Sequence, residues 1–368
     1  MEFRAKKMDL LGALYWTQGI VERRNTMPIL ANVLIESRKG GIHLTATDLE
    51  VGIRGKLDGE VVHEGVVTVG AKKLYEIVRE APEETLQIKR LENDWVEVKS
   101  GKSVFKIVGL DAREFPQFPK FEGEKLCSVP AKTLREMIER TIFSVSNDET
   151  RYNLNGVFIE EAKDGKVRMV ATDGHRLAMV DRAIGALGLG KGVILPRKGL
   201  TELKRLLEGA EDGLVSVGFK ENMGLVIKDE VELFMRLIEG DFPDYTKVIP
   251  KDNPQLARLD TGDFLHALRR VSLLSSERYK GIKMELKPGK VSIMANNPEL
   301  GEAAEDIEID YTGKALTVGF NARYLIDVLT VVGESGEVEV ALKDDVSPSI
   351  VRKTDDAGYL YVIMPMRL

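Results

Sequence analysis

Apolar and polar residues alternate in short runs along most of this chain, and stretches with helical spacing stand between those runs. Alternation over about four to eight residues is typical of a strand with one buried face, whereas apolar residues three and four positions apart indicate an amphipathic helix. The helical spacing occurs in six segments: 9–19, 71–80, 131–143, 197–208, 263–272 and 321–329. We therefore predict an α+β protein with six helices and many antiparallel hairpin strands.

A repeat of about 124 residues organises these elements. Each copy contains an alternating strand, an alanine and a polar turn, in the sequences HLTATDLE (43–50), RMVATDGH (168–175) and SIMANNPE (292–299). The alanines Ala46, Ala171 and Ala295 are 125 and 124 residues apart. Because three copies in one register rarely arise by chance, we predict three homologous domains, at 1–124, 125–250 and 251–368.

Composition narrows the class of protein. A chain of 368 residues, 43% of them hydrophobic, is long enough for several globular cores. It has no apolar run near the roughly 18 residues of a membrane span and no apolar signal core at its charged start, so a cytoplasmic protein is expected. The single Cys127 excludes an intramolecular disulfide, and the four histidines have no typical zinc-ligand spacing. No metal or cofactor is predicted.

The charge is unevenly distributed. The formal net charge is −6, yet the six helical segments with their flanks carry 20 basic and 12 acidic residues. A positive helical surface on an acidic body suits sequence-independent contact with a phosphate backbone. For any single helix, an ordinary solvated face explains the charge equally well. Duplex nucleic acid is therefore a predicted partner, contacted without base reading.

A second charge asymmetry separates two segments far apart in the chain. Segment 98–108 contains three lysines, among them Lys102, and no acid. Segment 298–310 contains six acidic residues, among them Glu299 and Glu302, and no base. Complementary charge on two such segments favours head-to-tail association of copies, which closes into a ring when the rotation allows. Two solvated strand faces are the equally weighted alternative.

The stretch VATDGHRLAM (170–179) is the main candidate for chemistry, because Asp173 precedes His175 by two residues. An acid–base pair would make the protein a hydrolytic enzyme, but the chain has no nucleophile motif such as G-x-S-x-G. The other two repeats place Asp48 and Asn297 at the same position, without a histidine. Asp and Asn in such turns commonly hydrogen-bond their own backbone, so a turn-holding role is favoured.

Two further stretches were considered for binding. The sequence GALGLGKG (185–192) nearly matches a phosphate-binding loop, but Gly192 replaces the hydroxyl that would hold magnesium, so a hairpin is favoured over nucleotide binding. The stretch YLYVIMPMRL (359–368) stays apolar almost throughout and contains two methionines. Such a segment is typical of a core strand or of an adaptable binding groove.

Several motifs together resemble one family. They are RYNLNGVFIE (151–160), ATDGHRLA (171–178), GDFPDY (240–245), ANNPE (295–299), FNARYLIDVL (320–329) and YVIMPMRL (361–368). In this combination and order the chain resembles the bacterial DNA sliding clamps, the β subunits of DNA polymerase III. The resemblance implies a head-to-tail homodimer that forms a six-domain ring, with helices lining the hole and antiparallel sheets outside. It also implies a non-catalytic processivity factor for DNA replication that encircles duplex DNA.

The resemblance further implies three groups of site residues. A pocket for short linear motifs of polymerase subunits, the clamp loader and repair proteins would comprise Leu154, Thr172, Gly174, His175, Arg176, Leu177, Pro243, Val248, Tyr279, Asn321, Tyr324, Val346, Val362, Ile363, Met364, Pro365, Met366, Arg367 and Leu368. Contacts to DNA would come from Arg24, Lys72, Tyr152, Arg197 and Lys198, with Arg151 and Arg270 added from their charge. The dimer interface would place Phe105 and Ile107 against Leu273 and Leu274, flanked by Lys102, Glu299 and Glu302.

Two other functions remain as alternatives. A hydrolytic enzyme that uses Asp173 and His175 predicts that turnover is lost when His175 is replaced by alanine. A three-repeat scaffold that does not bind DNA predicts that the charges of the helix lysines and arginines can be reversed without consequence.

Overall fold

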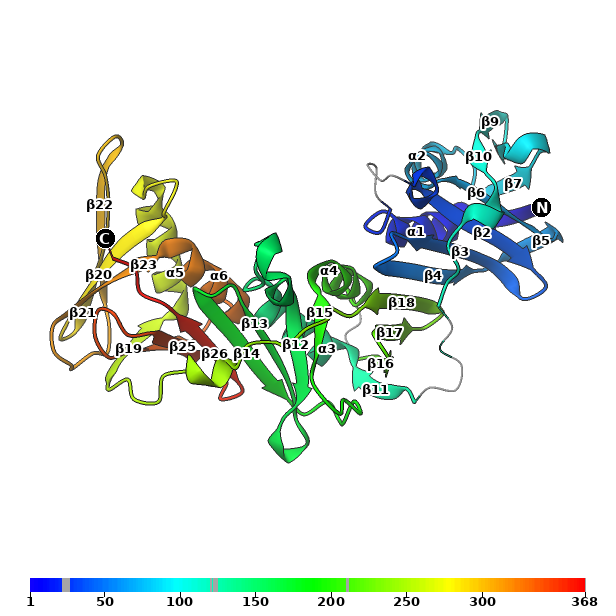
Figure 1. Ribbon diagram of the computed structural model, residues 1–368. Helices are drawn as coiled ribbons and strands as arrows, with labels where there is room; N and C mark the ends of the chain where they lie inside the picture. The colour runs from blue at the N-terminus through cyan, green and yellow to red at the C-terminus, as the bar shows by residue number, and fades with distance from the viewer. Residues whose placement is uncertain (22–26, 120, 122–124, 210–211, 368) are drawn as a thin grey trace. The chain divides into compact units, whose positions relative to one another are not determined.

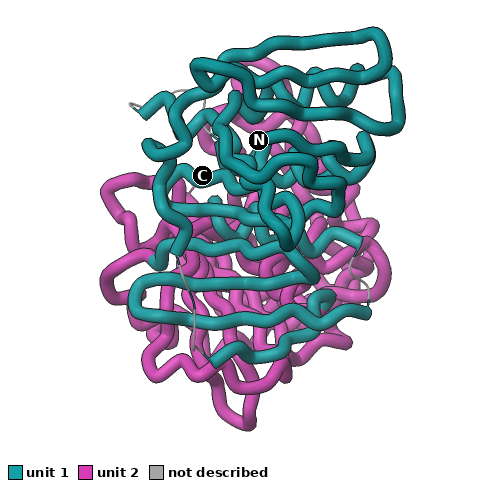
Figure 2. The backbone as a smooth tube through the Cα atoms, turned by 90° about the vertical axis from the view of Figure 1, so that its right-hand side faces the viewer, with its two compact units in different colours: residues 1–132, 198–237 teal, residues 133–197, 238–368 magenta. Residues whose placement is uncertain are grey.

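The computed structural model describes residues 1–21, 27–119, 121, 125–209 and 212–367. Within them the chain forms two compact units, one of residues 1–132 with 198–237 and one of residues 133–197 with 238–368 (Figure 2). The α+β class is confirmed, because each of the six predicted helical segments contains a helix and the strands pair antiparallel (Figure 1).

The first unit contains two antiparallel sheets. The smaller sheet has the strand order β5 (Gly59–His63), β1 (Glu2–Lys6), β7 (Thr85–Arg90), β8 (Val96–Ser100) and β9 (Ser103–Ile107). The larger sheet has the order β10 (Gly109–Leu110), β6 (Gly65–Gly70), β2 (Asn32–Arg38), β3 (Gly41–Thr47), β4 (Val51–Leu57), β18 (Val231–Arg236), β17 (Met223–Lys228), β16 (Leu214–Lys220) and β11 (Cys127–Pro130).

The second unit also contains two antiparallel sheets. The larger has the order β15 (Val193–Pro196), β12 (Gly156–Glu161), β13 (Val167–Thr172), β14 (Arg176–Arg182), β26 (Tyr359–Ile363), β25 (Ser349–Lys353), β24 (Glu337–Leu342) and β19 (Gln255–Asp260). The smaller has the order β22 (Gly301–Glu308), β21 (Lys290–Asn297), β20 (Gly281–Lys287) and β23 (Leu316–Asn321).

The helices follow the predicted repeat. They are α1 (Lys7–Thr17), α2 (Ala71–Glu80), α3 (Ala131–Ile142), α4 (Arg197–Leu206), α5 (Thr261–Val271) and α6 (Ala322–Val332). Short 3₁₀ turns link other elements: η1 (Pro28–Ala31), η2 (Glu92–Asp94), η3 (Ala112–Glu114), η4 (Glu149–Leu154), η5 (Lys163–Gly165), η6 (Tyr245–Lys247) and η7 (Ser272–Leu274). α1 packs on α2, and α5 packs on α6, so each pair turns its apolar side toward the strands.

Strands of neighbouring repeats pair directly at two junctions. At the first junction β4 pairs with β18, and at the second β14 pairs with β26, with Leu177 opposite Val362. The middle repeat therefore shares one sheet with the first repeat and another with the third. This sharing explains why the two compact units cut across the middle repeat, and the three domain boundaries stay a prediction.

Candidate functional site

The turn between β13 and β14 is built by hydrogen bonds from its own side chains. Asp173 Oδ1 accepts from the backbone N–H of His175 at 2.9 Å and of Arg176 at 3.0 Å. Thr172 Oγ1 accepts from the N–H of Gly174 at 3.1 Å and donates to the carbonyl of Arg176 at 2.6 Å. Gly174 has φ +88°, a left-handed conformation that glycine adopts without strain. The favoured interpretation of this stretch, a turn held by aspartate, agrees with this geometry.

Both oxygens of Asp173 are occupied by structural contacts. Oδ2 accepts from Arg176 Nε at 3.1 Å, while Oδ1 holds the turn. His175 contributes its backbone N–H to this arrangement, and its exposed side chain is not bonded to the carboxylate. A general base must be within hydrogen-bond reach of the proton that it removes. The hydrolytic alternative is therefore not favoured.

Arg176 connects this turn to two other elements. Its guanidinium donates to Asp327 Oδ2 on α6 at 2.6 Å and to the carbonyl of Phe143, just beyond α3, at 2.6 Å. It lies 4.4 Å from the ring centroid of Tyr324, and its side chain is only 9% exposed. Removing either carboxylate would leave a buried charge with fewer partners, so Arg176 fixes the turn relative to the third repeat.

The segment after β26 continues along the same turn. The backbone N–H of Met364 donates to the carbonyl of His175 at 2.9 Å, and that of Met366 donates to the carbonyl of Gly319 at 2.9 Å. Met364 itself is 39% exposed. The predicted pocket therefore joins the DGHR turn to residues 364–367 through main-chain bonds, and Leu368 lies outside the described residues.

An apolar floor lies on the outer face of the larger sheet of this unit. Leu177, Val362, Val170 and Tyr245 form one buried cluster, against which Phe158 and other half-buried side chains pack. The loop after β18 covers one side of this floor, since Phe242 stacks on Phe158 with ring centroids 5.0 Å apart. The same loop carries the predicted pocket residues Pro243 and Val248, both exposed.

The remaining predicted pocket residues lie in the same unit but play different structural roles. Asn321 caps α6 by accepting from the N–H of Arg323 at 2.9 Å. Leu154 is buried at the end of η4, Val346 is 60% exposed between β24 and β25, and Ile363 is fully buried at the end of β26.

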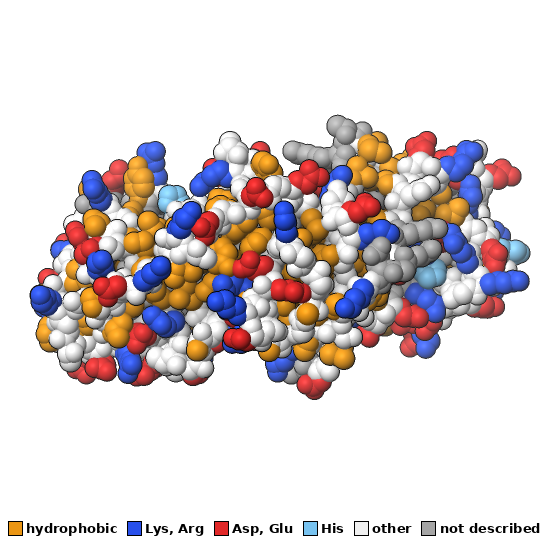
Figure 3. All heavy atoms as spheres, turned by 60° about the horizontal axis from the view of Figure 1, so that its bottom comes forward, with side chains coloured by type: hydrophobic (Ala, Val, Ile, Leu, Met, Phe, Trp, Pro, Cys, Tyr) orange, Lys and Arg blue, Asp and Glu red, His pale blue; other side chains and the backbone are white. Residues whose placement is uncertain are grey.

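A cavity of about 930 Å³ adjoins the segment after β26. It lies on the outer face of the smaller sheet and is lined by Tyr279, Met294, Ala304, Met366 and Arg367, among others. Figure 3 shows hydrophobic side chains gathered between charged ones on the left half of the view, where the C-terminal strands lie. Apolar side chains at the mouth of a concave surface are typical of a site that binds a peptide.

The predicted DNA contacts from the middle repeat lie on or near α4 and η4. Arg151 Nε donates to Asp148 Oδ2 at 2.9 Å, and Tyr152 is 58% exposed. Arg197 contacts Asn147, and the Lys198 ammonium lies beside the carboxylate of Asp48 and 3.4 Å from the carbonyl of Ile20. Surface ion pairs are weak, so these cations remain available to compete for phosphate.

The other predicted DNA contacts are more varied. Lys72 is exposed at the start of α2, and its ammonium lies 3.9 Å from Glu76. Arg270 forms a two-pronged pair with Glu305, at 2.9 and 2.5 Å, and Arg24 lies outside the described residues. The Arg270 pair occupies both prongs of the guanidinium, so we rank Arg270 below the cations of α4.

The predicted dimer residues lie beside two strands that end their sheets. Phe105 and Ile107 on β9 are half-buried on the helix-covered face. Leu273, 77% exposed, and Leu274 lie in η7, which packs beside β22. Lys102, Glu299 and Glu302 are exposed.

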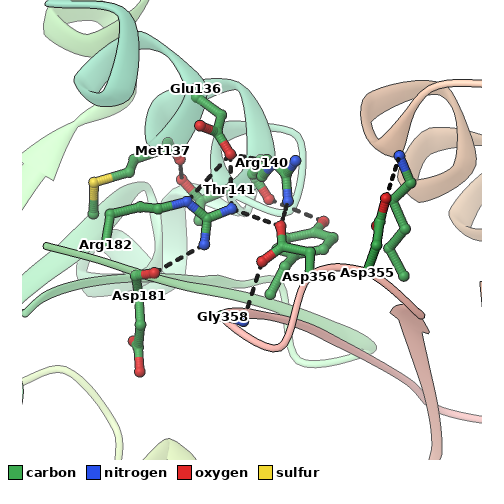
Figure 4. A network of polar contacts seen from close by, with 11 residues as sticks. Glu136, Met137, Arg140, Thr141, Asp181, Arg182, Asp355, Asp356 and Gly358 are labelled. Carbon is green, nitrogen blue, oxygen red and sulfur yellow. Dashed lines mark hydrogen bonds and ion pairs between the residues drawn. The ribbon is translucent and has the colours of Figure 1, made fainter.

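A second polar cluster, which the sequence analysis did not identify, ties α3 and β14 to the turn between β25 and β26. Arg182 Nη2 donates to Asp356 Oδ2 at 2.6 Å and to Glu136 Oε1 at 2.7 Å, and Arg140 contacts the same Asp356. Figure 4 shows both guanidinium groups directed at this carboxylate. Burial alone would raise the pKa of Asp356, but the Arg182 hydrogen bond and the Arg140 charge outweigh it, and the pKa is lowered.

Two further searches bear on function. Among the described residues, no group of three or more histidine, cysteine, aspartate or glutamate side chains is arranged to hold a metal ion. In the same part of the chain, no helix combines the length and the apolar character needed to cross a membrane.

Comparison with known proteins identifies the family. Three family models match in sequence: the DNA polymerase III beta subunit N-terminal domain at residues 1–119, its central domain at 128–244 and its C-terminal domain at 246–367. The beta sliding clamp of Pseudomonas aeruginosa is 39% identical over 371 residues, and that of Caulobacter vibrioides is 36% identical over 376, with all of each chain covered.

Solved structures agree with these relatives. The DNA polymerase sliding clamp of Bacillus subtilis has a TM-score of 0.94 at 30% identity and covers 100% of this chain and 99% of its own. The DnaN sliding clamp of Bartonella birtlesii, solved bound to griselimycin, has a TM-score of 0.95 at 34% identity and covers both chains fully. The chain belongs to the family of the DNA polymerase III β subunit, the beta sliding clamp.

Proposed function

We propose that two copies of this chain close head to tail into a ring around duplex DNA in the cytoplasm. The family is that of a processivity factor of DNA polymerase III and not of an enzyme. A closed ring needs only weak, sequence-independent phosphate contacts to stay on DNA, which agrees with the modest excess of basic residues in the helical segments. The ring raises processivity because it keeps the polymerase at high effective concentration near the template.

The proposed ring interface joins the free edges of β9 and β22. Each strand ends its sheet, so each has one row of unpaired backbone groups that another strand can complete. Lys102 and Lys106 near one edge complement Glu302 near the other. On the helix-covered face, Phe105 would meet Leu273 and extend the apolar core across the interface.

The docking pocket is the second part of the proposal. The observation that carries it is the hydrogen bond from the Met364 N–H to the His175 carbonyl, which aligns an exposed methionine-containing segment with the DGHR turn beside an apolar floor. Short linear motifs of polymerase subunits, the clamp loader and repair proteins would bind there. Griselimycin is bound to the Bartonella birtlesii relative, and an apolar cyclic ligand of that kind suits such a floor.

The docking proposal is tested by fluorescence anisotropy with a labelled Gln-Leu-Asp-Leu-Phe peptide. We expect saturable binding to the full chain and a loss of at least tenfold in affinity when residues 364–368 are deleted, because the rim of the floor is lost. The matched control is Leu300→Ala, which truncates an exposed leucine elsewhere in the same unit. Binding that survives the deletion in a folded protein would refute the pocket.

The DNA proposal is tested by retention of the chain on nicked circular plasmid after loading. Charge reversal of Arg24, Arg197 and Lys198 to glutamate is expected to shorten retention, because phosphate contacts are replaced by repulsion. Reversal of Lys39, Lys163 and Lys166, three exposed lysines on strand connections, is the matched control. Equal retention of both triple variants would favour the scaffold without DNA.

A further inference from the structure

The two junctions between repeats are built alike, atom for atom, in their backbone. At the first junction Asp48 Oδ1 accepts from the N–H of Glu50 at 2.9 Å and of Val51 at 2.7 Å, as Asp173 does from the second and third residues after it. The carbonyl of Glu50 accepts from the N–H of Arg236 at 2.7 Å, the counterpart of the bond from Met364 to His175. Strand register therefore matches positions of one junction to positions of the other.

The match shows how the side chains have diverged on the outer face. Leu177 and Val362, the floor of the docking pocket, correspond to Gly52 and Phe234, which are opposite each other on β4 and β18. The Phe234 ring lies over Gly52 and occupies the place where a Cβ would stand. At the first junction one aromatic ring thus covers the whole floor.

The wall beside the floor has diverged in one atom. The loops REFPQF (113–118) and GDFPDY (240–245) align so that Phe118 corresponds to Tyr245. Phe118 stands edge-on against Phe234, with ring centroids 4.7 Å apart and an interplanar angle of 89°. The first junction is therefore closed by two rings that pack on each other.

The hydroxyl of Tyr245 gives its ring a different attachment. It donates to Glu160 and accepts from Arg168 Nη1 at 3.1 Å, while Arg168 is itself held by Asp181 through two bonds of 2.7 Å. This side of the ring borders a cavity of about 790 Å³ and not packed side chains. Hydrogen bonds, more than packing, hold the ring at that place.

From these observations we infer that Tyr245 is a positioning residue of the docking pocket, whose hydroxyl keeps the aromatic wall beside the Leu177–Val362 floor and stops it from closing over that floor. The inference rests on the proposed docking function. Without the hydroxyl, the ring gains apolar contact by leaving the cavity edge and moving onto the floor. Phe118 at the first junction is the closed arrangement that results. The ligand admitted at the second junction is the apolar side chain of a linear peptide.

The test is Tyr245→Phe, which keeps the ring and removes only the hydroxyl. Anisotropy with the Gln-Leu-Asp-Leu-Phe peptide is expected to show affinity lowered about five- to tenfold, the effect of one lost hydrogen bond. The matched control is Tyr311→Phe, because Tyr311 is equally buried in the same unit and its hydroxyl is also hydrogen-bonded, to Gln255 at 3.1 Å. This control is expected to bind like the wild type.

A crystal structure of Tyr245→Phe separates failure of the inference from failure of the docking function. A ring that has moved toward Leu177 and Val362 supports the inference, even if the wild type binds no peptide and the docking function is refuted. A ring that stays at the cavity edge overturns it. Unchanged peptide affinity in Tyr245→Phe, or an equal loss in Tyr311→Phe, overturns it as well.

Discussion

A single backbone angle shows how far two repeats can differ in side chain while keeping one conformation. Leu49 has φ +80° and stands where the second repeat has Gly174 with φ +88°. A left-handed conformation costs a residue with a Cβ about 1–2 kcal/mol, and glycine avoids that cost. The hydrogen bonds of Thr47 and Asp48 hold the strained turn in place.

Leu49→Gly is expected to stabilise the first unit by about 0.5–1 kcal/mol, because relief of strain exceeds the added chain entropy of glycine in the unfolded state. The measurement is the urea midpoint of unfolding, followed by circular dichroism. Leu300→Gly, another exposed leucine next to a turn, is the comparison and should not stabilise. A lower midpoint for Leu49→Gly would show that Leu49 makes contacts worth more than the strain.

Among the elements, the turn between β25 and β26 depends most on charge. Asp356 receives Arg140 and Arg182, so one carboxylate joins α3, β14 and this turn. Its side chain is 16% exposed, which limits the screening of both pairs by water and salt.

Asp356→Asn is expected to destabilise the second unit by about 1–3 kcal/mol at neutral pH, because two half-buried guanidinium groups lose their shared anion. The folded-state pKa of Asp356 is below its ordinary value of 3.8, so the aspartate stabilises the fold above that pH. This stabilisation is lost as pH falls through the lowered pKa. Thermal melts of wild type and variant should therefore converge in acid. A constant difference at every pH would contradict this assignment.

Element positions could be predicted from sequence far better than the contacts between elements. Helical spacing and the repeated turn are local patterns, so all six helices and the role of Asp173 were found. The clasp at Asp356 joins residues up to 216 positions apart, and nothing in the sequence pairs them. The pocket was predicted in part by resemblance, whereas Tyr245, Phe143 and Asp327 contribute through tertiary packing that no local pattern encodes.

For the whole molecule, the proposed ring depends on one exposed leucine beside a free strand edge. Leu273→Glu is expected to raise the dimer dissociation constant roughly 100-fold, because a charge would be buried against Phe105 and Ile107 of the other copy. Sedimentation velocity across a concentration series measures this. Leu214→Glu, which alters an equally prominent leucine at 67% exposure, is the control. A variant that still sediments like the wild type would exclude this part of the interface.

The segment after β26 is held by main-chain atoms, whereas the DGHR turn is held by the side chains of Asp173 and Arg176. Selection can therefore replace Met364 or Met366 without moving the backbone that carries them. An inhibitor that relies on those two methionines would meet resistance at little cost to the bacterium. An inhibitor directed at the turn would not, because each escape substitution there also weakens the fold.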